Sequence, residues 1–367
     1  MGRKNKPDLI LLGISATLVF VGIFILASVS ASFSFQNFGT TFYFLNHQIL
    51  FGLLPGFLLG TAAFFMPLRF LKKISFAALL GNIILLMMVF LPVIGNTASA
   101  AHRWIFIGPI SFQPSELLKL TLIVYIAAWL ATKVSIGKQT ENWKTTLLPF
   151  GIVIGIISLL LIFQPDISTL GVIGITAIIM YFSSATPIWH SLLMIGGGIA
   201  TLIAVINLAP YRVSRLAVFF DPSLDPLGQG YQAKQALIGI GSGGITGVGL
   251  GLSFQKFGIL PEPISDSIYA IFAEEAGLLG ATFLVLLFLA FAWRGLVIAR
   301  RSRDEFSKLV IVGITSWITI QAFVNMGSMV GILPLTGIPL PFISYGGSAL
   351  VTELIALGIL LNISKQG

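Results

Sequence analysis

The chain has 367 residues, of which 56% are hydrophobic and only 9% are charged, and its mean hydropathy is +0.99. A soluble globular protein carries about 25% charged residues, so this composition excludes a soluble globular fold. Cysteine is absent, which excludes disulfides and thiol catalysis and leaves carboxylates and three histidines as metal ligands.

Apolar runs of about 20 residues, the length that crosses a bilayer, recur along the chain. The first run, 9–30, follows the basic start GRKNK but is too long for a signal peptide, so we expect a retained span. The sequence therefore predicts an all-α polytopic membrane protein with about ten transmembrane helices in one domain, residues 1–367. The predicted spans are 9–30, 46–66, 74–94, 115–132, 146–163, 168–184, 187–208, 267–293, 309–331 and 347–363.

The basic residues predict the orientation of these spans. With the N-terminus inside, fifteen of the 21 Lys and Arg residues fall in cytoplasmic segments, five fall outside, and Lys119 lies in a span. This bias obeys the positive-inside rule. The net charge of +8 therefore indicates topology and contact with anionic membrane lipids, and no nucleic-acid partner is expected. We expect cytoplasmic termini and a large extracytoplasmic loop, residues 209–266, between helices seven and eight.

A glycine-rich stretch within this loop, IGIGSGGITGVGLGLSFQKFG, contains a chance match to GxGxxG at Gly239, Gly241 and Gly244. No predicted strand or downstream ribose-binding acid accompanies the match, which makes a dinucleotide site a weak interpretation. We favour a mobile or re-entrant loop in which glycine lets backbone segments pack closely.

Charged side chains at membrane depth usually face a polar cavity and have a partner, because their burial in lipid is costly. In QPSELLK (113–119), Glu116 and Lys119 are three residues apart at the start of a helix and close enough to pair. A structural ion pair and a direct role on substrate both remain open. Upstream, Arg103 in AHRWI is predicted at the outer interface, as a headgroup anchor or as a bidentate clamp for pyrophosphate.

Four carboxylates gather in LPEPISDSIYAIFAEEAG (260–277). Glu262 lies between two prolines and is predicted on the loop surface, whereas Asp266 ends the long loop where the chain re-enters the membrane. Glu274 and Glu275 follow about two turns inside an apolar helix, where no helix cap explains them.

Basic residues are predicted to face these acids across a polar cavity. They are Arg103, Lys119, Arg212, Arg215 and Lys256. Such a site suits an anionic, membrane-bound substrate, and both an enzyme and a lipid or ion transporter remain open. Asp166, in the short turn FQPDIST, is expected to cap a helix.

Five motifs in this order resemble the SEDS family, the RodA, FtsW and SpoVE proteins, over nearly the whole chain. They are AHRWIFIGPISFQPSELLKL, FQPDIST, the segment from YRVSRLAVFF to GVGLG, QKFGILPEPISDSIYAIFAEEAG and GIPLPFISYGGSAL. The resemblance implies a peptidoglycan glycosyltransferase that polymerises lipid II at the outer face of the bacterial plasma membrane, with a class B penicillin-binding protein as partner. GLSFQKFGILPE favours the division branch over the elongation branch.

The resemblance also assigns residues. The family's essential aspartate falls on Asp266, its Glu/Lys pair on Glu116 and Lys119, and its Arg-Trp arginine on Arg103. Two departures stand out: ISDSI replaces the His-Thr-Asp-Phe of many relatives, and alanines occupy positions 100 and 101 before the arginine motif.

The implied chemistry needs one base. A sugar hydroxyl attacks an anomeric carbon while polyprenyl pyrophosphate leaves, so Asp266 is the predicted base. The five basic residues named above would stabilise the leaving group. No cofactor is firmly indicated, but a divalent cation, Mg²⁺ or Mn²⁺, is a candidate helper with Asp266 as a candidate ligand. Glu274 and Glu275 are expected to brace the cavity. A lipid II flippase is the alternative function, and a scaffold without chemistry is a third.

Overall fold

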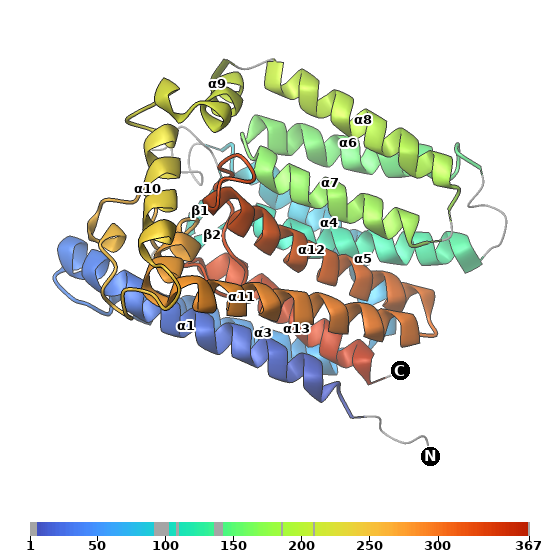
Figure 1. The fold of residues 1–367 in the computed structure, drawn as a ribbon. Helices are drawn as coiled ribbons and strands as arrows, with labels where there is room; N and C mark the ends of the chain where they lie inside the picture. The colour runs from blue at the N-terminus through green and yellow to red at the C-terminus, as the bar shows by residue number, and fades with distance from the viewer. Residues whose placement is uncertain are drawn as a thin grey trace.

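The computed structural model describes residues 6–91, 103–107, 110–135, 142–184, 186–207 and 210–365, which form one bundle of helices (Figure 1). The long helices lie side by side, and α9 and α10 gather at one end of the bundle. The helices are α1 (Leu9–Phe38), α2 (Tyr43–Gln48), α3 (Leu54–Phe65), α4 (Leu68–Met88), α5 (Pro114–Ser135), α6 (Leu147–Phe163), α7 (Ile167–Phe182), α8 (Ile188–Asn207), α9 (Pro210–Phe220), α10 (Gln229–Ser242), α11 (Ile268–Arg301), α12 (Glu305–Met329) and α13 (Gly347–Ser364).

Each predicted span overlaps a helix or, for 46–66, α2 and α3, which a π-helical turn, Ile49–Leu53, joins into one rod. The span predicted at 74–94 is displaced, because α4 begins at Leu68 and ends at Met88, and residues 92–94 lie outside the described part of the chain. Seven helical segments of the described chain are long and apolar enough to cross a membrane, and three shorter apolar helices lie at 147–163, 167–182 and 188–204. The expectation of an integral membrane protein is therefore confirmed. A total of ten crossings stays a prediction.

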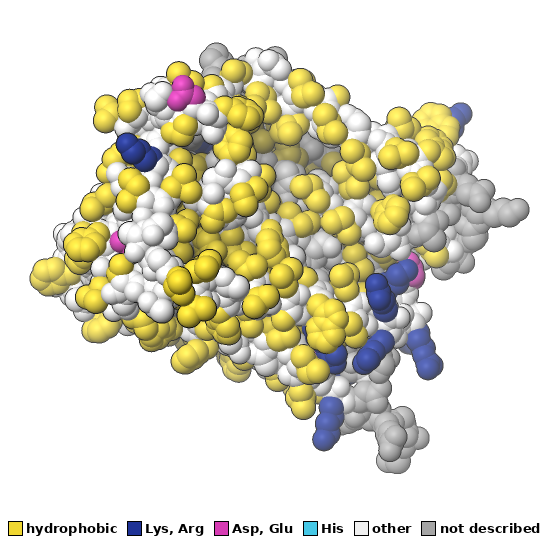
Figure 2. Space-filling view, viewed as in Figure 1, with side chains coloured by type: hydrophobic (Ala, Val, Ile, Leu, Met, Phe, Trp, Pro, Cys, Tyr) yellow, Lys and Arg dark blue, Asp and Glu magenta, His cyan; other side chains and the backbone are white. Residues whose placement is uncertain are grey.

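The start of α1 and the end of α13 lie together. The backbone amide of Asp8, the N-cap residue of α1, donates to Ser364 Oγ at 3.0 Å. The Asp8 carboxylate also pairs with Arg294 of α11, at 2.6 Å between Oδ2 and Nη2. Lys and Arg side chains gather at this end of the bundle, opposite α9 and α10 (Figure 2). The charge bias seen along the sequence is thus also a bias between the two ends of the molecule.

Helices α5, α12 and α13 form the most buried part of the bundle, and Trp317 of α12 and Leu118 of α5 are almost fully enclosed. Close contact between α3 and α13 depends on glycine. A Cβ atom added to Gly358 would lie 2.0 Å from the carbonyl oxygen of Gly60. Small residues allow helix backbones in membranes to approach closely, which increases their van der Waals contact.

One feature departs from the predicted all-α fold. Strands β1 (Ile105–Ile107) and β2 (Ile110–Phe112) pair antiparallel, with Ile105 opposite Phe112. Both strands are rich in β-branched and aromatic residues, which favour extended structure. The hairpin lies directly before α5 and leads the chain into Pro114, the first residue of that helix.

The glycine-rich stretch is ordered and packs against α11. Helix α10 (Gln229–Ser242) lies within the predicted connection 209–266, and its last residues, 238–242, belong to the glycine-rich stretch, so the prediction of a loop is wrong there. Helix α11 is interrupted at Gly277 (φ +66°, ψ −167°). Amides of the segment 244–249 donate to the carbonyls of Glu274 and Glu275 at 3.0 and 3.1 Å, and amides just after the break donate back to the segment at 2.9 and 3.1 Å. Glycine thus allows close backbone packing, as expected.

Candidate active site

Asp266 lies near the end of a loop, residues 258–267, which we call the Asp266 loop. Helix α11 starts directly after this loop with Ser267 as its N-cap residue, so the Asp266 carboxyl is not used as a helix cap. Asp266 Oδ1 accepts a hydrogen bond from Ser265 Oγ at 3.3 Å, and the same hydroxyl lies 3.1 Å from Glu262 Oε2. The Asp266 side chain is partly exposed. Asp266 is therefore a half-buried acid beside a second carboxylate, Glu262.

The surroundings of Asp266 make its carboxylate a stronger base than usual. Burial raises the pKa of Asp266 to about 6, and the negative charge of Glu262 adds to the rise. Hydrogen bonds from the side chains of Ser265 and Gln232 oppose the shift. At pH 7 the group is still mostly ionised, yet its pKa lies close to the operating pH, where a general base is most effective.

Three contacts fix the backbone around Asp266. Asn325 Nδ2 of α12 donates to the Asp266 carbonyl at 2.8 Å. The amide of Tyr345 donates to the carbonyl of Ile264 at 2.8 Å, and Ser344 Oγ donates to the carbonyl of Ser265. Ser344 and Tyr345 belong to residues 338–346, the part of the α12–α13 connection that directly precedes α13, which we call the bracing loop. Elements far apart in the sequence thus set the position of Asp266.

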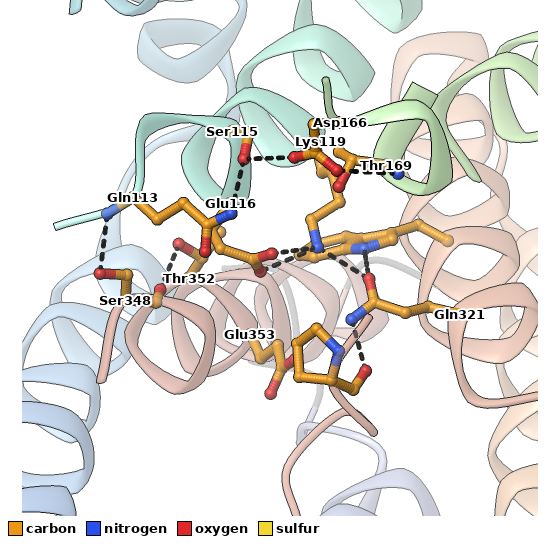
Figure 3. Close-up of polar contacts among 12 residues, drawn as sticks. Gln113, Ser115, Glu116, Lys119, Asp166, Thr169, Gln321, Ser348, Thr352 and Glu353 are labelled. Atoms are coloured by element: carbon orange, nitrogen blue, oxygen red, sulfur yellow. Dashed lines mark hydrogen bonds and ion pairs between the residues drawn. The ribbon is translucent and has the colours of Figure 1, made fainter. Parts of the chain in front are cut away.

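The predicted pair of Glu116 and Lys119 forms. Lys119 Nζ lies 2.8 Å from Glu116 Oε2, and each side chain is only 3% exposed. Lys119 also donates to Gln321 Oε1 of α12 at 2.7 Å and lies 5.2 Å from the centre of the Trp317 ring (Figure 3). The pair therefore joins α5 to α12, which supports the structural interpretation of these two residues.

One face of α12 connects this ion pair to the Asp266 loop. Gln321 Nε2 donates to the carbonyl of Pro339 at 2.9 Å, and Asn325, one turn further along α12, bonds to the carbonyls of both Ile338 and Asp266 at 2.8 Å. Residues four apart lie on the same face of a helix. Hydrogen bonds therefore run from Lys119 through Gln321 and the bracing loop to the Asp266 loop.

The sequence analysis missed Glu353 of α13. This carboxyl is 1% exposed and lies in electrostatic range of Glu116 and Lys119 (Figure 3). Glu353 Oε2 accepts a hydrogen bond from the amide of Phe342 in the bracing loop at 2.7 Å. A lone acid in the apolar run of 347–363 was a visible signal, because acids at membrane depth are usually functional.

Arg103 and Asp166 both stabilise the turn between α6 and α7. Asp166 is the N-cap residue of α7 and accepts from the amide of Thr169, which confirms its predicted role. It also accepts from Ser115 Oγ at 3.2 Å. Arg103 donates to the backbone carbonyls of Gln164 and Pro165. The guanidinium thus binds two backbone carbonyls directly after α6.

Glu274 and Glu275 are buried, and both bind residues in the second half of the glycine-rich stretch. Glu275 Oε1 pairs with Lys256 Nζ at 3.0 Å, and its other oxygen accepts from Ser28 of α1 at 2.7 Å. Glu274 accepts from Ser253 Oγ and from the amide of Phe254 at 3.2 Å. Both acids and Lys256 therefore hold this segment against α11.

The two arginines of α9 lie at the same end of the bundle as α10 (Figure 1). Arg215 is exposed, and its Nε lies 2.7 Å from the side-chain oxygen of Gln229 at the start of α10 when that amide is oriented to accept. The side chain of Arg212 and the alanines at 100 and 101 lie outside the part of the chain that is described.

Comparison with known proteins agrees with this geometry. A family model described as cell cycle protein, which covers FtsW, RodA and SpoVE, matches residues 8–367. The chain is 38% identical to stage V sporulation protein E of Bacillus subtilis, over 99% of this chain and 98% of that protein. It is 37% identical to a probable peptidoglycan glycosyltransferase FtsW of Nitrosococcus halophilus, over 100% and 94% of the two chains.

Solved structures share the fold. One chain of a peptidoglycan synthase complex, described for its coordination of polymerisation and crosslinking, superimposes with a TM-score of 0.80 at 26% identity, over 98% of this chain and 97% of that one. The rod shape determining protein RodA of Thermus thermophilus gives 0.71 at 24% identity, over 98% and 96%. The fold and its buried charges define an integral membrane protein of the RodA-like class. The chain belongs to the FtsW/RodA/SpoVE family, as the sequence motifs predicted.

Proposed function

We propose that this protein is a peptidoglycan glycosyltransferase that polymerises lipid II, with Asp266 as the general base. Relatives named probable peptidoglycan glycosyltransferase FtsW, 36–39% identical, support the activity. The structural observation that carries the proposal is the Asp266 carboxyl. It is partly exposed, its pKa is raised to about 6, and contacts from two other segments fix its backbone.

In the proposed polymerisation reaction, Asp266 is the base in a displacement at an anomeric carbon. The oxygen of a sugar hydroxyl forms a bond to the anomeric carbon of a second lipid II molecule while Asp266 takes the hydroxyl proton. The bond from that carbon to the pyrophosphate oxygen breaks, and its electron pair leaves with polyprenyl pyrophosphate. Because pyrophosphate is a good leaving group, it needs charge stabilisation rather than a general acid.

The basic side chains divide into two groups by burial. Lys119 and Lys256 are buried, each in an ion pair with a glutamate, and Arg103 binds backbone carbonyls. Arg215 is exposed on α9. We assign contact with the pyrophosphate to the α9 arginines, Arg212 and Arg215, and a supporting role to the buried cations.

We propose that a divalent cation binds at the Asp266 loop. Among the described residues no three His, Asp or Glu side chains form a group that could hold a metal. Mg²⁺, however, is usually held by one or two carboxylates together with water and substrate phosphates. Asp266 and Glu262, whose carboxylates lie on either side of the Ser265 hydroxyl, would be its ligands. A bound cation would neutralise charge on the departing pyrophosphate.

We also propose the orientation of the protein in the membrane, its partner and its branch of the family. The basic end of the bundle, with both termini, faces the cytoplasm, and the Asp266 loop faces the outer leaflet, in agreement with the positive-inside rule. The likeness to a chain of a synthase complex that polymerises and crosslinks supports a class B penicillin-binding protein as partner. The FtsW names among the relatives support the division branch.

One experiment separates polymerisation from lipid transport. The purified protein is placed in vesicles that carry fluorescent lipid II, and both glycan strands and lipid II transfer between leaflets are measured. We expect glycan strands from the protein and from the matched control Asp221→Asn, whose exposed carboxylate binds only Ser223 in its own turn. Lipid II transfer without any glycan would instead establish the flippase alternative.

A further inference from the structure

Glu353 is a buried acid that the proposed reaction does not use. It lies on α13 and is 1% exposed. Only one of its two oxygens, Oε2, has a hydrogen-bond partner within the described residues. A carboxyl at this depth is costly to retain, which points to a specific task.

Its partner is a strained part of the bracing loop. Phe342, whose amide donates to Glu353 at 2.7 Å, has a φ of +64°. Bulky residues adopt this left-handed conformation only where the surrounding structure enforces it. The carbonyl of Phe342 is enclosed as well, because a Cβ atom added to Gly22 of α1 would lie 2.1 Å from its oxygen. Glu353 thus supplies the acceptor that keeps Phe342 in this conformation.

The strained turn places Ser344. The amide of Leu340 donates to Ser344 Oγ at 2.8 Å, and the amide of Ser344 donates back to the Leu340 carbonyl at 3.0 Å. These two hydrogen bonds join residues 340 and 344 and so close a turn that contains Phe342. The Ser344 hydroxyl then donates to the carbonyl of Ser265, the residue before Asp266.

We infer that Glu353 is a positioning residue for Asp266, which acts through the Phe342 amide and the Ser344 hydroxyl. The inference rests on the proposed role of Asp266 as the base. Without the Glu353 acceptor the Phe342 amide is a buried donor with no partner, and the turn relaxes toward a conformation with negative φ. Ser344 then moves away from Ser265, and the Asp266 loop gains exposure to water.

A glutamine at this position preserves the contact. Its amide oxygen can accept from the Phe342 amide, and it carries no charge into the electrostatic range of Glu116. Methionine matches the length of the side chain but has no comparable acceptor. Thr352→Val is the matched control, because Thr352 is buried on the same helix and, among the described residues, bonds only to the Ser348 carbonyl at 2.9 Å.

The test measures kcat and KM for lipid II polymerisation by the wild type, Glu353→Met, Glu353→Gln and Thr352→Val. We expect Glu353→Met to lower kcat about tenfold and to leave KM unchanged, because small positioning errors reduce catalysis strongly. Glutamine and the control should keep the wild-type kcat. Both constants are expressed per folded protein, so loss of folded protein alone changes neither.

A second measurement does not depend on activity. Amide hydrogen exchange should accelerate in residues 338–346 and 258–267 of Glu353→Met and stay unchanged in Glu353→Gln. If the methionine variant does not fold, Ser344→Ala replaces it and should show the same loss of kcat. An unchanged kcat, or unchanged exchange in both loops, overturns the inference. Absence of glycan from the wild type would refute the proposed function instead, and exchange would still decide the role of Glu353.

Discussion

Separate removal of Lys119 and Glu116 should have unequal effects, because the two residues have different neighbours. Lys119→Met leaves the buried Glu116 carboxylate without its cation, and it also removes the cation that lies in electrostatic range of Glu353. Glu116→Gln leaves Lys119 with Gln321 and the Trp317 ring. We therefore expect the lysine variant to be the more damaging of the two.

The magnitude follows from the geometry of the pair. At 2.8 Å and an effective dielectric constant of about 20, the attraction between the two charges is about 6 kcal/mol. Breaking a buried pair by removal of one partner costs about 3–5 kcal/mol, because the other charge stays buried. We expect a loss in this range for Lys119→Met and a smaller loss for Glu116→Gln, with activity reduced in both.

The assay is a double-mutant cycle on resistance to thermal unfolding in detergent and on polymerisation rate. The variant Glu116→Gln/Lys119→Met has no unpaired charge in the pair, so its loss should be smaller than the sum of the two single losses. Thr121→Val is the control, because Thr121 is partly buried on the same helix and, among the described residues, bonds only to carbonyls of that helix. Losses that add up within error would refute a coupled pair.

Three further predictions address topology, the base and the helix break. The chain has no natural cysteine, so single cysteines can report its topology. Ser223→Cys should react with an impermeant thiol reagent from outside intact cells, and Ser302→Cys should not. The reverse pattern would show that the predicted membrane topology is inverted. The polymerisation rate should rise with pH through about 6, since the Asp266 carboxyl must lose its proton to act, and Glu262→Gln should move this limb to lower pH. Gly277→Ala should lower the yield of folded protein severely, because a Cβ atom there lies 2.3 Å from backbone; near-normal yield and stability would contradict the need for glycine.

The helices and the paired charges could be predicted from local patterns. Runs of apolar residues locate most of the helices to within a few residues. The spacing of Glu116 and Lys119 predicts their ion pair, because residues three apart share a helix face. The role of Asp166 as a helix cap was also predictable, because Asp is a favoured residue directly before the first turn of a helix. These features depend only on residues close together in the sequence.

Contacts between distant segments could not be predicted. Nothing local indicates that Lys256 pairs with Glu275, that Arg103 donates to the turn at 164–165, or that Ser344 braces the Asp266 loop. The glycine-rich stretch was interpreted as a loop in which glycine allows close backbone packing, yet its first residues, 238–242, belong to α10. Glu353 stands alone in the apolar run 347–363, so no neighbouring charge in the sequence indicates its contact with the distant Phe342.

The central claim is that Asp266 is the base, and the rate of glycan formation by purified Asp266→Asn tests it most directly. Asparagine keeps the size of the side chain but lacks a basic oxygen, so folding and lipid II binding should persist while polymerisation falls by about 10²–10⁴-fold, the usual contribution of a general base. Asp266→Glu should recover little, because a shift of roughly 1 Å can cost about 10²-fold. Glycan strands formed at near wild-type rate by well-folded Asp266→Asn would contradict the assignment.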